Sequence, residues 1–150
     1  MSLQEELLSF ANSVGDMFRR RVAETPDGLA FLDPDRAPEG PNQWTRYTWA
    51  ESRLLVDQLA AGLLTRGLSR EQRVGIISTT RLEWILLDLA VACAAGATTT
   101  VYPNTAAGDV EFILDDSGTC IVVVEDATQL AKVEASPTLR AADHTIVVID

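Results

Sequence analysis

The polar residues Ser78, Thr79, Thr80 and Arg81 form the segment of the sequence best suited to bind an anion. They follow residues 74–77, an apolar segment that predicts a strand, and they precede a predicted helix. Backbone N–H groups and hydroxyls at such a turn can hold a phosphate or carboxylate, and ligands of parallel sheets bind where strands end. A nucleotide phosphate usually also meets a lysine or a glycine-rich turn, and this segment has neither. We therefore favour a structural interpretation, in which Thr80 caps the helix and Arg81 pairs with an acid, and keep the four residues as the candidates for cofactor binding.

The other residue types that carry out catalysis or bind metals form no recognisable site. The sequence has no GxGxxG, GxxxxGK[ST] or GxSxG motif, one histidine, His144, and one lysine, Lys132. Two pairs of adjacent acids, residues 115–116 and 125–126, lie at predicted turns, where acidic residues are common. We accordingly predict no catalytic residue and no metal ligand in this chain.

The composition argues against two classes of partner. The 150 residues, 47% hydrophobic and 23% charged, suit one globular domain. A formal net charge of −10 opposes binding to nucleic acid and electrostatic attachment to anionic membranes, since both depend on clustered Lys and Arg. The longest apolar run, residues 84–97, contains Asp88 and is shorter than the roughly 20 residues of a membrane span, so it predicts a buried helix.

The two cysteines, Cys93 and Cys120, each lie in an apolar run and have no second Cys or His at metal-ligand spacing. They predict buried free thiols. The acidic N-terminus shows no signal peptide. Both features are typical of a reducing, cytoplasmic compartment.

Hydrophobic periodicity predicts alternating helices and strands. Helices are expected over residues 3–24, 48–66, 80–95, 105–115 and 128–135, and strands over residues 44–48, 74–77, 98–101, 121–124 and 145–149, with a shorter strand near residue 31. Capping-box sequences at residues 48–51 and 80–83 mark two of the helix starts, and Thr105 is expected to cap a third. The alternation from residue 44 onward indicates an α/β fold with a largely parallel sheet covered on both faces.

Apolar side chains indicate which faces of these elements are buried. The continuous apolar run at residues 121–124 predicts a strand buried on both faces. The helix at residues 48–66 is expected to bury a row of leucines, which are Leu54, Leu55, Leu59, Leu63 and Leu64.

Several short motifs follow one another along most of the chain. They are Tyr47-Thr48-Trp49-Ala50-Glu51, Arg81 with Glu83-Trp84, Ala95-Gly96-Ala97, Tyr102-Pro103-Asn104-Thr105 and Ile113-Leu114-Asp115-Asp116-Ser117. Their order and spacing resemble the N-terminal part of the AMP-forming acyl-CoA synthetases, which are adenylate-forming enzymes, and especially the long-chain fatty acid–CoA ligases. Thr80, Leu82 and Gly108 depart from the residues usual in that family.

The resemblance implies that residues 1–150 are the N-terminal portion of an AMP-binding domain, without the remainder of that domain or the C-terminal domain. It implies an enzyme that uses ATP, Mg²⁺ and CoA to convert a long-chain fatty acid, through an acyl-adenylate, into acyl-CoA, AMP and pyrophosphate. The family's phosphate loop, metal-binding acid, ribose-binding aspartate and C-terminal lysine have no matching positions here. We therefore expect the chain to bind none of these cofactors and to be inactive alone. The resemblance leaves peripheral membrane contact and a homodimer open for the intact enzyme.

Two other functions are compatible with the sequence. The chain would be a stand-alone flavodoxin-like module that binds a nucleotide or anion at residues 78–80. Alternatively, it would be a structural or interaction module with an exposed apolar patch formed by Phe10, Phe18, Trp44 and Trp49.

Overall fold

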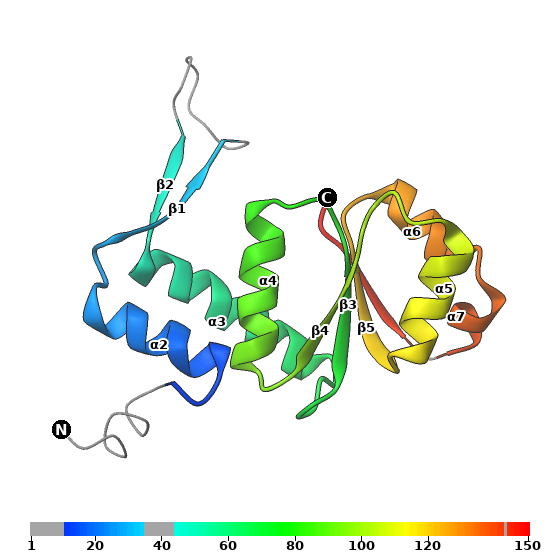
Figure 1. Cartoon of the computed structure of the whole chain (residues 1–150), viewed down its shortest axis with the longest axis horizontal. Coiled ribbons are helices and arrows are strands. Elements are labelled where there is room, and N and C mark those ends of the chain that lie inside the picture. The colour runs from blue at the N-terminus through cyan, green and yellow to red at the C-terminus, as the bar shows by residue number, and fades with distance from the viewer. Residues whose placement is uncertain (1–10, 35–43, 143) are drawn as a thin grey trace.

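The computed structural model describes residues 11–34, 44–142 and 144–150, and its elements carry the labels of Figure 1. The helices are α2 (Val14–Glu24), α3 (Trp49–Thr65), α4 (Leu82–Cys93), α5 (Ala107–Asp116), α6 (Ala127–Glu134) and α7 (Pro137–Ala141). The strands are β1 (Leu29–Asp33), β2 (Thr45–Thr48), β3 (Arg73–Ile77), β4 (Ala97–Val101), β5 (Thr119–Val124) and β6 (Thr145–Val148). The predicted α/β fold is confirmed. The sequence did not predict α7, and residues 3–10 of the first predicted helix lie outside the described residues.

The described residues form a four-stranded sheet in the order β4-β3-β5-β6, with every neighbouring pair parallel. The predicted alternation from residue 44 is confirmed, but the implication that its first strand, residues 44–48, joins the parallel sheet is wrong. That strand, β2, pairs antiparallel with β1 in a separate ribbon that projects from the body of the molecule (Figure 1). No described helix lies between β1 and β2, and strands without such a crossover pair antiparallel.

Helices cover both faces of the parallel sheet, as predicted. α2, α3 and α4 lie on one face, and α5, α6 and α7 lie on the other (Figure 1). Residues of β5 alternate between the two hydrophobic clusters: Ile121 and Val123 pack with α3 and α4, whereas Val122 and Val124 pack with α5 and α6. The prediction of a strand buried on both faces at residues 121–124 is therefore confirmed.

Gly75 in β3 lets α5 lie directly against the sheet. A Cβ at this position would lie 2.5 Å from Cδ2 of Leu114 and 3.2 Å from Cγ2 of Thr119. Leu114 is fully buried, so a shift of its side chain would have to displace close-packed neighbours. The close approach of helix and strand here requires glycine.

The start of α3 confirms the capping box at residues 48–51. Thr48 accepts a hydrogen bond from the backbone N–H of Glu51, and the Glu51 carboxylate accepts one from the backbone N–H of Thr48. The predicted leucine face is only partly correct, because Leu54 and Leu64 are 64% and 51% exposed. The residues of α3 that are buried are Ser52, Val56, Ala60 and Leu63. Most of these side chains are small, and they let α3 pack closely against α4 and the sheet.

The predicted caps of two other helices are wrong. α4 begins at Leu82, and its N-cap is Arg81, whose backbone is extended and whose side chain makes no cap hydrogen bond. Thr80 therefore does not cap this helix. α5 begins after Ala106, because Thr105 lies in a turn where its N–H donates to the carbonyl of Tyr102.

Trp49 holds α2, α3 and β1 together. Its ring lies 6.2 Å from the Phe18 ring and 5.9 Å from the Phe31 ring, with the Arg21 guanidinium 5.5 Å from its centre. Phe18 is buried and Trp49 half-buried, so the predicted exposed patch does not include them. Trp44 is exposed, and Phe10 lies outside the described residues.

Candidate functional site

The strand order predicts where a ligand would bind. Counted along the chain, the parallel strands lie in the order second, first, third, fourth, as they do in flavodoxin-like sheets. The connection after β3 leads to α4 on one face, and the connection after β5 leads to α6 on the other. The crevice between the carboxyl ends of β3 and β5 is thus the expected binding place. Residues 78–81 directly follow β3, so they border this crevice.

A carboxylate of the chain itself fills the crevice. The backbone N–H and the hydroxyl of Thr79 each donate a hydrogen bond of 2.7 Å to the two carboxylate oxygens of Glu125, which follows β5. Ser78 is buried, and its hydroxyl donates to the carbonyl of Thr79 at 2.9 Å. Thr80 is exposed beside them. The predicted anion-binding segment therefore holds an anion, and that anion is Glu125.

Arg81 lies among three carboxylates. Its Nε donates a hydrogen bond of 2.7 Å to Glu83, its Nη1 lies 3.6 Å from Glu125, and its Nη2 lies 3.5 Å from Asp150. The hydrogen bond to Glu83 is the main cause that raises the pKa of the Arg81 guanidinium above its ordinary value. These contacts join the start of α4 to the ends of β5 and β6. They confirm the prediction that Arg81 pairs with an acid.

The geometry does not fit a nucleotide or a metal ion. The donors of Thr79 are bound to Glu125, and Arg81 is shared among acids, so an added phosphate would meet carboxylates. Within the described residues no group of three His, Cys, Asp or Glu side chains could hold a metal ion. The two adjacent acids at residues 125–126 have different contacts. Glu125 binds Thr79, whereas Asp126 caps α6 by accepting a hydrogen bond of 2.9 Å from the backbone N–H of Gln129.

The sequence interpretation missed the partnership between Thr79 and Glu125, which are 46 residues apart. One feature of the sequence could have indicated it, because residues 78 and 125 each directly follow an apolar run that predicts a strand. When two such strands are parallel neighbours, the residues that follow them lie at the same edge of the sheet. Sequence alone did not show that β3 and β5 are neighbours. Asp150 lies in the same cluster because β6 pairs in parallel with β5, so that the carboxyl ends of the two strands are adjacent.

The remaining reactive side chains have structural contacts. Lys132 is half-buried, and its ammonium donates to the carbonyls of Pro103 and Thr105, the latter at 3.0 Å. Cys93 and Cys120 are free thiols and half-buried, which is less buried than predicted. Burial is the main cause that raises the pKa of the Cys93 thiol. None of these contacts indicates catalysis.

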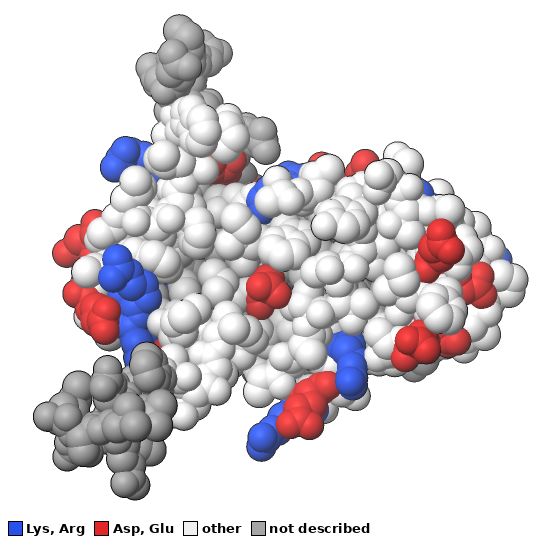
Figure 2. Space-filling model, in the orientation of Figure 1, with Lys and Arg blue, Asp and Glu red and all other residues white. Residues whose placement is uncertain are grey.

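The charged side chains visible on one face of the described part of the chain point to no further site. On the face shown in Figure 2, Lys and Arg side chains are scattered near the edge with Asp and Glu among them, and the centre is largely uncharged. Within the described ranges every helix is too short or too polar to span a bilayer.

Comparison with known proteins supplies the family. A family model described as AMP-binding enzyme matches residues 18–150. The chain is 35% identical over 101 residues to the long-chain-fatty-acid–CoA ligase FadD15 of Mycobacterium bovis, covering 65% of this chain and 17% of that protein. It is 32% identical over 118 residues to the long-chain-fatty-acid–CoA ligase heimdall of Drosophila melanogaster, covering 79% of this chain and 17% of that protein.

The solved structures agree with the fold. A fatty acyl CoA synthetase of Mycobacterium tuberculosis superposes with a TM-score of 0.81 and 23% identity, over 92% of this chain and 26% of that chain. The chain therefore spans about a sixth of the length of these two ligases and about a quarter of this solved chain.

Proposed function

The chain belongs to the AMP-binding enzyme family, and on that premise we propose that it forms the N-terminal part of the AMP-binding domain of a long-chain fatty acid–CoA ligase. The observation that carries the proposal is the family match over residues 18–150 together with the 35% identity to a long-chain-fatty-acid–CoA ligase. The intact enzyme is cytoplasmic, which is consistent with two free thiols.

The proposed reaction has two halves. A long-chain fatty acid reacts with ATP to give an acyl-adenylate and pyrophosphate, and the thiol of CoA then takes the acyl group and releases AMP. Mg²⁺ serves as the metal cofactor of the intact enzyme. The described residues of this chain do not fit ATP or Mg²⁺, so no step is assigned to them. In the proposal this chain contributes the sheet β4-β3-β5-β6 and its covering helices as a scaffold, and it is inactive alone.

The test compares the chain of residues 1–150 with the native polypeptide that carries this sequence. Fatty-acid-dependent exchange of pyrophosphate into ATP and formation of acyl-CoA are measured for both. We expect both activities from the native polypeptide and neither from residues 1–150. Exchange by residues 1–150 would refute their inactivity, and a native polypeptide that forms no acyl-CoA would refute the ligase.

The flavodoxin-like strand order favours a second candidate function, a stand-alone module that binds a nucleotide or anion at the crevice. The carboxylate of Glu125 opposes it, because it already binds the donors of Thr79. Calorimetric titration of residues 1–150 with ATP, AMP, CoA and flavin mononucleotide separates the two candidates. We expect no saturable binding, and saturable binding of any of the four would favour the module.

A further inference from the structure

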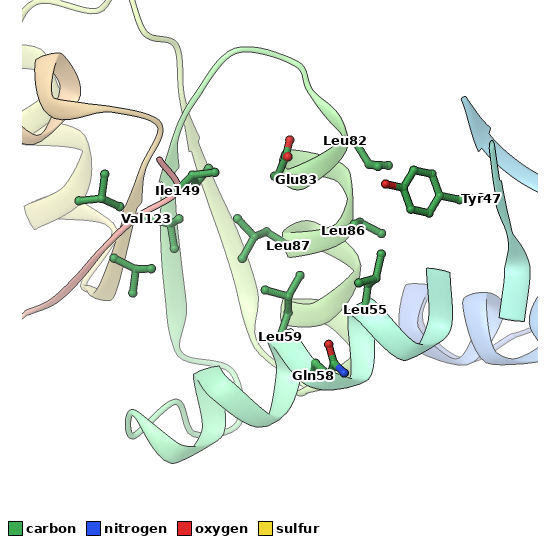
Figure 3. A pocket seen from close by; sticks show the side chains of 12 residues that line it. Tyr47, Leu55, Gln58, Leu59, Leu82, Glu83, Leu86, Leu87, Val123 and Ile149 are labelled. Carbon is green, nitrogen blue, oxygen red and sulfur yellow. The ribbon is translucent and has the colours of Figure 1, made fainter. Parts of the chain in front are cut away.

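An apolar groove of about 400 Å³ lies on the sheet face that carries α3 and α4. Figure 3 shows leucines of α3 and α4 on one side of it, with Val123 of β5 and Ile149 of the segment after β6 to their left. Its apolar side chains include Leu55, Leu59, Leu86, Leu87, Val147 and Ile149. Gln58 and Glu83 are its hydrophilic side chains apart from Tyr47. The carboxylate of Glu83 accepts a hydrogen bond of 2.7 Å from Arg81. The residues that line the groove include no Lys, Arg or His.

The topology explains why the groove is open. The connections from β4 to β5 and from β5 to β6 run in the same direction across the sheet. Right-handed crossovers therefore place α5, α6 and α7 on one face. On the opposite face α3 and α4 cover β3 and β5, and the described residues supply no helix over β6. Val147 of β6 and Ile149 just after it pack on this face, and both remain only half-buried as a result.

A crossover to a further strand beside β6 would not close the groove. The right-handed rule would place its helix on the face of α5, α6 and α7 again. A segment that covered the groove would instead have to reach it from the α3–α4 side. An apolar surface left open beside a sheet edge is typical of a binding interface.

The relatives indicate where that segment comes from. The family model matches through residue 150, and the chain spans only 17% of the two ligases compared above. Ile149 lines the groove, so a polypeptide continuing from Asp150 starts beside it. We propose that the groove is an intramolecular interface, covered by an apolar surface of the part of the AMP-binding domain that follows Asp150. This inference rests on the proposed function.

The charges of the groove favour a protein segment over a fatty acid. The lining residues include the carboxylate of Glu83 and no cation that could balance the carboxylate of a bound fatty acid. An apolar helix or strand surface brings no such charge. Gln58, exposed at the rim of the groove, can donate and accept hydrogen bonds with the backbone of an arriving segment.

The test is hydroxyl-radical footprinting read by mass spectrometry, with the native polypeptide purified from its host and residues 1–150 compared side by side. We expect oxidation of Leu55 and Leu59 in residues 1–150 and its loss in the native polypeptide. Leu54, on the same helix but outside the groove, is the internal control and is oxidised in both.

A matched pair of variants adds a second measurement. Leu59→Gln is expected to lower the melting temperature of the native polypeptide more than that of residues 1–150, because only the former loses a covered apolar contact. Leu54→Gln is expected to change both equally little. Equal shifts for Leu59→Gln in the two proteins would overturn the proposal.

Each footprinting outcome decides the proposal. Equal oxidation of Leu55 and Leu59 in both proteins overturns it, and so does a native polypeptide of 16.3 kDa, which would have no following segment. Protection that appears only when palmitate is added also overturns it and assigns the groove to an acyl chain. Protection that depends on protein concentration assigns it to a second copy and overturns it too. Acyl-CoA formation is measured separately, so loss of the ligase proposal and loss of the interface proposal are distinguishable.

Discussion

Replacing Glu125 with alanine is expected to weaken the junction between β3 and β5. The carboxylate accepts two hydrogen bonds of 2.7 Å from Thr79 and lies 3.6 Å from Arg81. A hydrogen bond to a charged group contributes about 1.5–3 kcal/mol. Thr79 is exposed and water replaces the lost acceptor, so we expect a total loss of about 2 kcal/mol in the free energy of unfolding, near the lower end of that range.

The loss is measurable by urea unfolding of residues 1–150, followed by circular dichroism. For a domain of this length a loss of about 2 kcal/mol corresponds to a fall in melting temperature of about 4–8 °C. Glu125→Gln keeps an amide oxygen for the N–H of Thr79, but it loses the charge and places an NH2 group where the second oxygen accepted from the Thr79 hydroxyl. We expect it to lower the free energy by about 1 kcal/mol, about half as much as the alanine variant.

Asp116→Ala is the control, because this acid is exposed on α5, away from the crevice. It should change the free energy of unfolding by less than about 0.5 kcal/mol. The reasoning is refuted if Glu125→Ala is as stable as the unsubstituted chain. It is also refuted if the glutamine and alanine variants are equally unstable, because the amide oxygen that glutamine retains would then contribute nothing.

Gly75→Ala should lower the free energy of unfolding by about 1–3 kcal/mol in urea, since its Cβ would meet Leu114 at 2.5 Å. Thr48→Ala should cost about 1 kcal/mol in the same assay, because α3 loses its side-chain cap. The backbone N–H of Thr48 donates to the Glu51 carboxylate and holds the pKa of this carboxyl below its ordinary value of 4.5. The ionised carboxylate therefore contributes its full stabilisation above pH 4.5. This stabilisation is lost as the pH falls through the lowered pKa of the folded state. The stability difference between the unsubstituted chain and Glu51→Ala should therefore shrink below pH 4.5. Cys93 should react with iodoacetamide at pH 8 more slowly than in urea, because burial raises its pKa.

Two of these predictions have a matched control variant, and each has an outcome that would contradict it. Gly108→Ala adds a Cβ with no neighbour within 4 Å and should not destabilise the chain. Thr48→Ser keeps the capping hydroxyl and should retain most of the stability. A Gly75→Ala variant of full stability would show that Leu114 can move. A pH-independent effect of Glu51→Ala, or equal alkylation of Cys93 in the folded and unfolded chain, would contradict the corresponding pKa argument.

The sequence predicted the helices and strands well because their signals are local. The apolar run at residues 121–124 and the capping box at residues 48–51 depend on neighbours within a few positions. Both are confirmed. Nothing in that local pattern could show that β2 pairs with β1, because pairing is a long-range property. The predicted sheet was therefore correct in type and wrong in membership.

The errors at the candidate site have the same origin. Residues 80–83 have the sequence of a capping box, yet the N-cap is Arg81 rather than Thr80, and Glu83 accepts a hydrogen bond from the Arg81 side chain. Arg81 is also held by Glu125 and Asp150, which are distant in sequence, and its extended backbone makes it the N-cap. The buried face of α3 was misjudged because leucine was taken as the signal of burial, whereas close packing selected smaller residues such as Ser52 and Ala60.

The position of β3 in the middle of the sheet has a consequence for protein synthesis. β3 is the first parallel strand to leave the ribosome, and each later strand pairs with one already made: β4 and β5 with β3, and β6 with β5. The sheet therefore grows outward in the order of translation, and no new strand has to separate an existing pair. Because translation adds about 5–20 residues per second, the β3–β4 unit has time to form before β5 is available to join it.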